Sequence, residues 1–160
     1  AQDLGFAQNN IRILSGLYGV LRPLDLMKPY RLEMGTKFAN NRGKNLYEYW
    51  DDSLANHIKK ELTSHKENVV LNCASLEYFK VIDRPSLDIN VITPQFKDMK
   101  NGQYKMISFF AKKARGMMAR FVIQNRIEHV DDILTFDLGG YSYNQSLSTP
   151  NQPVFTRSQS

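Results

Sequence analysis

The sequence predicts a mixed α/β fold in which short, mainly buried strands and a β-hairpin pack against several amphipathic helices. Apolar residues recur at three- and four-residue steps in several segments, and short β-branched or apolar runs lie between these segments. Turn-forming residues separate two of the runs, as in a hairpin. A chain of 160 residues, 42% of them hydrophobic, is long enough to bury one core. Residues 1–160 are therefore expected to form one domain or part of a larger one.

The first predicted helix spans residues 6–21. Its apolar residues follow helical spacing, and Pro23 is expected to end it. Gly16 and Gly19 each lower helix stability by about 1 kcal/mol. They indicate either close packing against another backbone or the closing turn. The connection that follows, up to residue 34, is expected to be rich in turns and then extended.

A second amphipathic helix is predicted over 46–62, where apolar residues form one stripe and charged residues lie mostly outside it. The apolar run 68–73 is typical of a strand that is buried on both faces. Residues 75–82 resume a helical pattern. The last two segments together predict a strand-loop-helix unit.

Two strand-like runs, 89–96 and 104–110, are predicted to form the β-hairpin. The segment that separates them, 97–103, contains Asn101 and Gly102, which favour a turn. The register of this hairpin would place both runs in one antiparallel pair.

The strongest helical pattern covers 111–127, where apolar residues fall on one face and basic residues fall opposite. Short strands are predicted over 133–136 and 154–156. A loop rich in glycine, serine and asparagine, 139–151, separates these two strands.

The net charge of +5 is concentrated in one segment. Residues 104–127 contain six bases and no acid, so the rest of the chain has a balance of −1. A second enrichment, over 12–44, has seven bases and two acids. Clustered positive charge favours an anionic partner, either nucleic acid or a phosphorylated ligand, because it raises the local potential and releases counterions when phosphates bind. The alternative is a solvated helix face that only aids solubility.

The predicted helix 111–127 places its bases on an arc of roughly 160°, with Gly116 and Ala119 between them. Small residues between cations allow a phosphate backbone to approach closely. The candidate nucleic-acid-binding residues on this helix are Lys112, Lys113, Arg115, Arg120 and Arg126.

A second candidate site follows the predicted strand 68–73, because α/β folds commonly bind ligands at the carboxyl end of a buried strand. Its candidate ligand-binding residues are Asn72, Ser75, Glu77 and Lys80. The alternative is that Asn72 and Ser75 only satisfy the backbone at a helix start, with Ser75 as the N-cap. Cys73 is expected to be a buried, inert thiol, since no histidine lies near it in the sequence.

No other chemistry is indicated by the sequence. The three histidines have no metal-binding spacing, and neither a catalytic set nor a cofactor motif is present, so no metal, cofactor or catalytic residue is predicted. No apolar run approaches the roughly 20 residues that span a bilayer, and no secretion signal is seen. With a single cysteine, the chain favours a reducing, cytoplasmic compartment.

Several stretches, in order along nearly the whole chain, resemble the bacterial YaaA peroxide-stress protein family. They are LSGLYGVLRPLDLMKPYRLEMG at 14–35, LYEYW at 46–50, NCASLEYFK at 72–80, ISFFAKKARGMMARFVIQNR at 107–126, GY at 140–141 and VFTR at 154–157. Members of this family are longer, about 250 residues, so the chain resembles their C-terminal portion. The family more often has leucine where Cys73 stands, which should be a packing change.

The resemblance implies a cytoplasmic protein that limits unincorporated iron during peroxide stress and binds DNA through a basic cleft in a mixed α/β fold. The expected partner is double-stranded DNA or another nucleic acid. It further implies a helix-hairpin-helix element, for which 6–28 is one candidate. Arg22, Lys28 and Arg31 match family motifs and are expected to extend the phosphate track of the basic helix. The leading hypothesis is thus a non-enzymatic, DNA-binding stress protein without strong sequence specificity.

Two alternatives stay open. One is an enzyme or binding protein for a small phosphorylated or carboxylated ligand, held near Asn72 with Lys112 or Arg115 as the anion clamp. The other is direct iron chelation, against which the absence of a histidine, cysteine and carboxylate cluster argues. The sequence does not reveal the oligomeric state.

Overall fold

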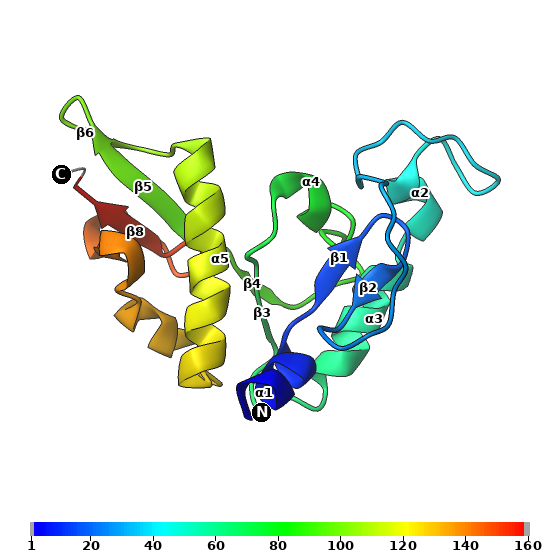
Figure 1. The fold of residues 1–160 in the computed structure, drawn as a ribbon, viewed down its shortest axis with the longest axis horizontal. Helices are drawn as coiled ribbons and strands as arrows, with labels where there is room; N and C mark the ends of the chain where they lie inside the picture. The colour runs from blue at the N-terminus through cyan, green and yellow to red at the C-terminus, as the bar shows by residue number, and fades with distance from the viewer. Residues whose placement is uncertain (1, 159–160) are drawn as a thin grey trace. The chain divides into compact units, whose positions relative to one another are not determined.

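The computed structural model describes residues 2–158, which form two compact units. Unit 1 comprises residues up to 65 together with 74–88, and unit 2 comprises 66–73 together with 89 onward. Both units contain helices and strands (Figure 1), so the mixed α/β prediction is confirmed. The assignment of residues 1–160 to a single domain, or to the C-terminal portion of a larger one, stays a prediction. None of the helices in the described residues is both long and apolar enough to cross a bilayer.

Unit 1 combines a small hairpin with four helices. Its elements are α1 (Gln2–Asn10), β1 (Ile13–Ser15), β2 (Gly19–Leu21), α2 (Leu46–Trp50), α3 (Ser53–Leu62) and α4 (Leu76–Phe79). Strands β1 and β2 are antiparallel, and β1 lies against α4. The predicted short helix over 75–82 is present as α4, which covers only the residues Leu76–Phe79.

The predicted helix 6–21 is wrong beyond Asn10, because the chain turns into the β1-β2 hairpin. Gly19 adopts φ +76°, a left-handed conformation that suits glycine. A Cβ on Gly16 would lie only 2.4 Å from the carbonyl oxygen of Leu32. The hydroxyl of Ser15 accepts a hydrogen bond from the backbone N–H of Tyr18 (2.9 Å), which closes the turn. The two glycines therefore mark a turn and a close backbone contact.

The predicted helix 46–62 is present as two helices, α2 and α3. Asp51 interrupts it with φ +44°. Asn45 caps the start of α2, since its side-chain oxygen accepts a hydrogen bond from the N–H of Glu48 (2.9 Å). The apolar stripe continues through the break, because Leu46 and Leu54 are both buried.

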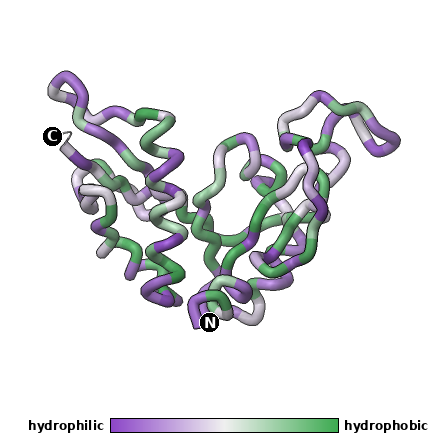
Figure 2. The backbone as a smooth tube through the Cα atoms, in the orientation of Figure 1, coloured by the Kyte–Doolittle hydropathy of each residue, from purple (hydrophilic) through white to green (hydrophobic). Residues whose placement is uncertain are grey.

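Unit 2 contains two sheets and one long helix. Its elements are β3 (Val69–Leu71), β4 (Asn90–Ile92), β5 (Gln95–Lys100), β6 (Gln103–Lys105), α5 (Ser108–Asn125), the 3-10 helices η1 (Val130–Thr135), η2 (Leu138–Gly140) and η3 (Gln145–Leu147), β7 (Ser142–Tyr143) and β8 (Val154–Arg157). Strands β3 and β4 form a parallel pair, and Figure 2 colours most of their residues as hydrophobic. The second sheet has the order β6-β5-β8-β7, and β5 and β8 are parallel. Strand β3 is half-buried along its length, which differs from the strand buried on both faces that the sequence predicts.

The β-hairpin exists, but its boundaries differ from the prediction. Its turn is the dipeptide Asn101-Gly102, whose φ angles of +53° and +75° are those of a tight two-residue hairpin turn. Strand β5 therefore runs up to Lys100, through residues that the sequence assigns to the loop. Residues 107–110 lead into and begin α5 and do not form a strand, and β4 pairs with β3.

The core of unit 2 is aromatic. Phe96 of β5 stacks on Phe155 of β8, with ring centroids 5.5 Å apart, and Phe136 meets both rings edge-on. Helix α5 lies along β5 and η2 and contributes buried Met118 and Phe121. The predicted strand 133–136 is wrong, because Ile133 lies in the 3-10 helix η1 and Phe136 follows as its C-cap. Both side chains are buried. The predicted strand 154–156 is confirmed as β8, and the predicted loop 139–151 contains β7 and η3.

Candidate functional site

Helix α5 is the element that carries the candidate site, and the sequence places it within a few residues. It begins after Ile107, whose backbone is extended, and ends at Arg126, which adopts the left-handed conformation with φ +49°. Its buried residues are Ala111, Ala114, Met118 and Phe121. Because these lie on one side, the opposite side of α5 is left to solvent.

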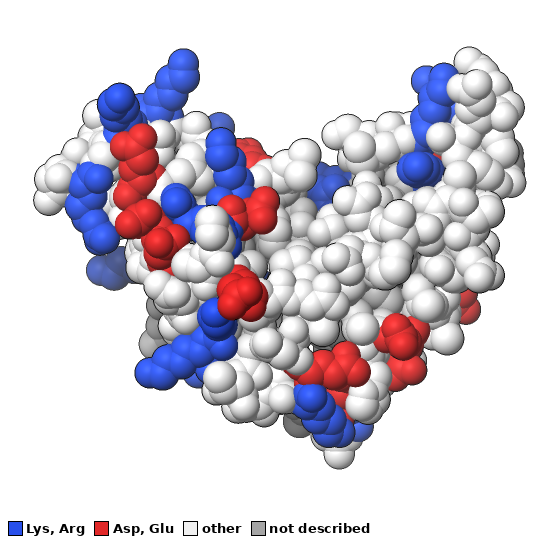
Figure 3. Space-filling model, turned by 180° about the vertical axis from the view of Figure 1, so that it is seen from behind, with Lys and Arg blue, Asp and Glu red and all other residues white. Residues whose placement is uncertain are grey.

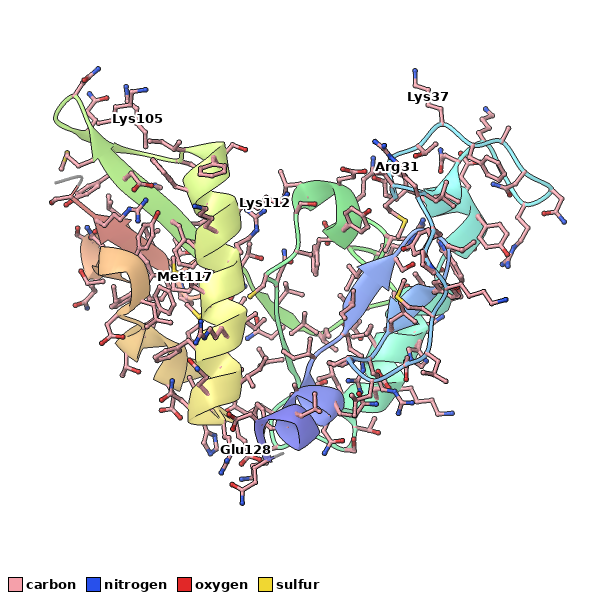
Figure 4. The ribbon with its side chains drawn as sticks, viewed as in Figure 1. Arg31, Lys37, Lys105, Lys112, Met117 and Glu128 are labelled. Carbon is pink, nitrogen blue, oxygen red and sulfur yellow. The ribbon has the colours of Figure 1, made fainter. Side chains whose placement is uncertain are left out.

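The structure separates the five predicted α5 cations into different settings. Lys112, Lys113 and Arg120 are exposed, whereas Arg115 is half-buried and Arg126 forms the end of the helix. In Figure 4, Lys112 leaves α5 on the side opposite Met117. The cations therefore spread around the exposed part of the helix and do not form one narrow stripe.

A hollow of about 480 Å³ lies beside α5 within unit 2. Its lining is Phe110, Lys113, Gly116, Met117, Arg120, Gly139 and Arg157. The first five of these residues follow one another at steps of one or three residues along α5, on one side of the helix. Gly139 comes from η2 and Arg157 from the end of β8. Lys113 and Arg120 thus border a space, while Lys112 faces away from it. Met117 is half-buried, packs against the core of unit 2 and also borders this space.

Arg157 is the one cation of the hollow that the sequence prediction missed. It ends β8, and its Nε donates to a carboxylate oxygen of Asp98 on β5. Its Nη1 donates to the carbonyl oxygen of Gly139 (3.0 Å). The guanidinium also lies over the rings of Tyr141 (4.5 Å) and Phe110 (4.8 Å). The sequence VFTR could have pointed to Arg157, since it ends a strand of buried residues with an arginine.

Asp98 is completely buried and accepts a second hydrogen bond, from the hydroxyl of Tyr141 (2.9 Å). Burial raises the pKa of Tyr141 to about 12, and the hydrogen bond to Asp98 raises it in the same direction. The phenol is therefore protonated at neutral pH and acts as a donor. Together, Tyr141 and Arg157 satisfy a carboxylate that has no access to water.

The three predicted cations of unit 1 have different charge environments. Arg22 pairs with Asp25 (3.0 Å) and Arg31 with Glu33 (3.2 Å), which partly neutralises both. Lys28 is exposed, and its side chain has no salt bridge to the described residues. In Figure 3, cations and acids are interspersed over unit 1, at the left of the view. Their continuity with the α5 cations stays a prediction.

The acids of these pairs show the effect of their partners. The backbone N–H of Arg22, and then its guanidinium, hold the pKa of Asp25 below its ordinary value. The pKa of Glu33 is lowered by its own backbone N–H and then by Arg31. Both acids are consequently ionised at neutral pH, and each offsets one positive charge.

The alternative ligand site after β3 has side chains that are already engaged. A carboxylate oxygen of Glu77 accepts the N–H of Gly35 (2.8 Å), and the ammonium of Lys80 lies 4.9 Å from the ring centre of Tyr47. Ser75 stands at the N-cap of α4 without a capping bond from its hydroxyl. Buried Asn72, which belongs to unit 2, donates from its amide to the hydroxyl of Thr93 (3.3 Å).

Cys73 has the properties of an inert thiol. Burial raises its pKa to about 12, and the positive charge of Arg115 opposes this only in part. The thiolate, which is the nucleophilic form, is thus scarce at neutral pH. Within residues 2–158, no group of three histidine, cysteine or acidic side chains is placed to hold a metal ion.

Comparison with known proteins gives consistent matches. The family model described as "Peroxide stress protein YaaA" matches residues 1–147. A UPF0246 protein of Colwellia psychrerythraea is 57% identical over 159 residues, which cover 99% of this chain and 62% of that protein. A UPF0246 protein of Alteromonas mediterranea is 54% identical over 159 residues, covering 99% of this chain and 61% of that protein. The chain thus spans about three fifths of the length of these relatives.

Proposed function

The chain belongs to the YaaA family of peroxide stress proteins, and from this premise we propose that it binds double-stranded DNA in the peroxide stress response and helps to limit unincorporated iron. Ferrous iron reduces hydrogen peroxide to hydroxide and the hydroxyl radical, which damages DNA. A protein that binds DNA and lowers free iron would act where this damage occurs. The proposal assigns the binding step to phosphates and not to base edges.

The observation that carries the proposal is the exposed, acid-free basic surface of α5. Lys112, Lys113 and Arg120 are exposed, and no acid occurs anywhere in 104–127. Gly116 is exposed between them and leaves room for a phosphate to approach the helix. Cations of this kind neutralise phosphates and release counterions, which gives affinity for any duplex sequence.

The half-buried Arg115 and the helix-ending Arg126 complete the proposed surface on α5. Arg22, Lys28 and Arg31 of unit 1 are proposed as further phosphate contacts. Lys28 contributes most in that unit, because Arg22 and Arg31 are each paired with an acid. Binding by such a set has little sequence specificity, since the contacts are to the sugar-phosphate backbone.

The alternative, a small anionic ligand held at Asn72, Ser75, Glu77 and Lys80, has less support. The carboxylate of Glu77 and the ammonium of Lys80 already have partners within unit 1. A ligand there would have to displace both contacts. Of the α5 cations, Lys113 lies over the ring of Phe109, whereas Lys112 and Arg120 are exposed, so duplex binding is the function that the geometry favours.

The test is fluorescence-anisotropy binding of the 160-residue chain to a random-sequence duplex over a salt series. Binding should weaken steeply with salt, with a log-log slope of about −3 to −4 if about four phosphates are contacted. Arg120→Glu should weaken binding to every duplex sequence. Lys60→Glu is the matched control, because it reverses an exposed charge on α3 and changes the net charge equally. Equal affinities of the two variants, or no binding by the folded chain at low salt, would overturn the proposal.

A further inference from the structure

We propose that the hollow beside α5 is a binding site for a nucleoside monophosphate. The phosphate is held by Lys113, Arg120 and Arg157, and the base rests against Phe110 and Met117. This goes beyond duplex binding, because it assigns a compact ligand to the hollow and adds a residue, Arg157, that the duplex surface does not include.

Arg157 supplies a cation whose position is fixed before any ligand arrives. Asp98 and the carbonyl of Gly139 hold its Nε and Nη1, and the rings of Tyr141 and Phe110 flank the guanidinium. The side chain is 22% exposed, so part of it is still open to the hollow. A preordered arginine loses little conformational entropy when an anion binds.

The charge of the hollow is positive. Asp98 balances Arg157, but Lys113 and Arg120 add two charges, and no acid belongs to the lining. The ammonium of Lys113 lies 4.6 Å from the ring centre of Phe109, which keeps it next to α5. Two further cations beside one fixed guanidinium suit a phosphate, whose oxygens accept several charge-assisted hydrogen bonds.

The rest of the lining is apolar and offers space. Phe110 and Met117 present an aromatic ring and a thioether, both of which favour contact with a flat base. Nothing lies within 4 Å of the Cβ that a side chain at Gly116 would have, so the hollow is open at that point. Its volume of about 480 Å³ falls in the range of small-molecule sites, roughly 300–1,000 Å³.

The test uses isothermal titration of the 160-residue chain with AMP, and with adenosine and inorganic phosphate as the two halves of the ligand. AMP should bind saturably at one site and more tightly than either half. Gly116→Leu fills the hollow while every cation is kept, and it should weaken AMP about tenfold or more. Gly116→Ala is the matched control, because its methyl group leaves most of the space, and it should retain affinity.

The bound nucleotide could be a free mononucleotide or the phosphorylated end of a nucleic-acid strand. A short single strand with a terminal phosphate is therefore tested as a competitor of AMP, next to the same strand without that phosphate. Competition by the phosphorylated strand alone assigns the site to a strand end, and no competition by either strand assigns it to a free mononucleotide. Failure of the folded chain to bind AMP would overturn the proposal, and so would unchanged affinity in Gly116→Leu. Duplex binding is read out separately with Lys112→Gln, because Lys112 belongs to the duplex surface but not to the lining of the hollow. This change should weaken duplex binding and leave the affinity for AMP unchanged.

Discussion

Arg157 donates from Nε to the carboxylate of Asp98, which is completely buried. The two residues lie 59 positions apart, and the parallel register of β5 and β8 places them opposite each other. Tyr141 donates to the other carboxylate oxygen (2.9 Å). The sheet register therefore places Arg157 next to Asp98. Arg157 and Tyr141 are the side chains that hydrogen-bond to this buried carboxylate among the described residues.

Replacing Arg157 by methionine should destabilise unit 2 strongly. The change leaves Asp98 buried without its cation, and breaking a buried ion pair in this way costs about 3–5 kcal/mol. The free energy of unfolding, measured by urea denaturation with far-UV circular dichroism, should fall by that amount for Arg157→Met.

Arg31→Met is the control for this prediction. Arg31 pairs with Glu33 at 3.2 Å, but its side chain is 90% exposed, and exposed ion pairs contribute little to stability. A loss in Arg157→Met no larger than that in Arg31→Met would show that the Asp98 pair is not needed for folding.

Gly116→Ala should stabilise the chain, whereas Gly16→Ala should destabilise it. Gly116 is exposed in the middle of α5 with open space around its Cα, so alanine should add about 1 kcal/mol through helix propensity. A Cβ at Gly16 would meet the carbonyl oxygen of Leu32 at 2.4 Å, a backbone atom that has little freedom to move. Thermal unfolding of the two variants should therefore give shifts of opposite sign, and a shared sign would contradict the assigned geometry.

The sequence predicts segments well where one local signal dominates. The 111–127 pattern locates α5, and Asn101-Gly102 marks the hairpin turn, although the turn is tighter than expected. The prediction of a helix over 6–21 was wrong, because the spacing of apolar residues does not reveal that the backbone of Gly16 lies close to the carbonyl group of Leu32. That contact depends on a segment 16 residues further along, so no local pattern reports it.

The candidate site was predictable only in part. The charge of α5 is visible in the sequence, and it draws attention to Lys113 and Arg120, which border the hollow. The sequence did not predict the hollow, because the pairing of β8 with β5 places Arg157 beside it and the 3-10 helix η2 places Gly139 there. Spatial neighbours that meet across a sheet leave no spacing signal in the chain.

Glu61 should make stability fall with acidity. Its pKa is lowered from 4.5, first by the hydrogen bond from Arg12, whose Nε lies 2.6 Å from the carboxylate. Because the pKa of Glu61 is lower in the folded state than in the unfolded state, the stabilisation by ionised Glu61 is fully present above the unfolded-state pKa. This stabilisation is lost as the pH falls through the folded-state pKa. Glu61→Gln should reduce stability at pH 7 by about 1 kcal/mol or less, with the difference from wild type vanishing at low pH. Melting temperatures across this acid range test it, and a difference independent of pH would contradict it.

Salt dependence should separate the contributions of individual cations to duplex binding. Neutralising one phosphate contact lowers the log-log salt slope by about 1, so Lys113→Gln should show about that change in anisotropy titrations. Arg31→Gln should change the slope less, because Glu33 already offsets that charge at 3.2 Å. Lys28→Gln should fall between them, since Lys28 is exposed without a salt bridge among the described residues. Equal slopes for all three variants would show that pairing with acids does not decide which cations meet phosphate.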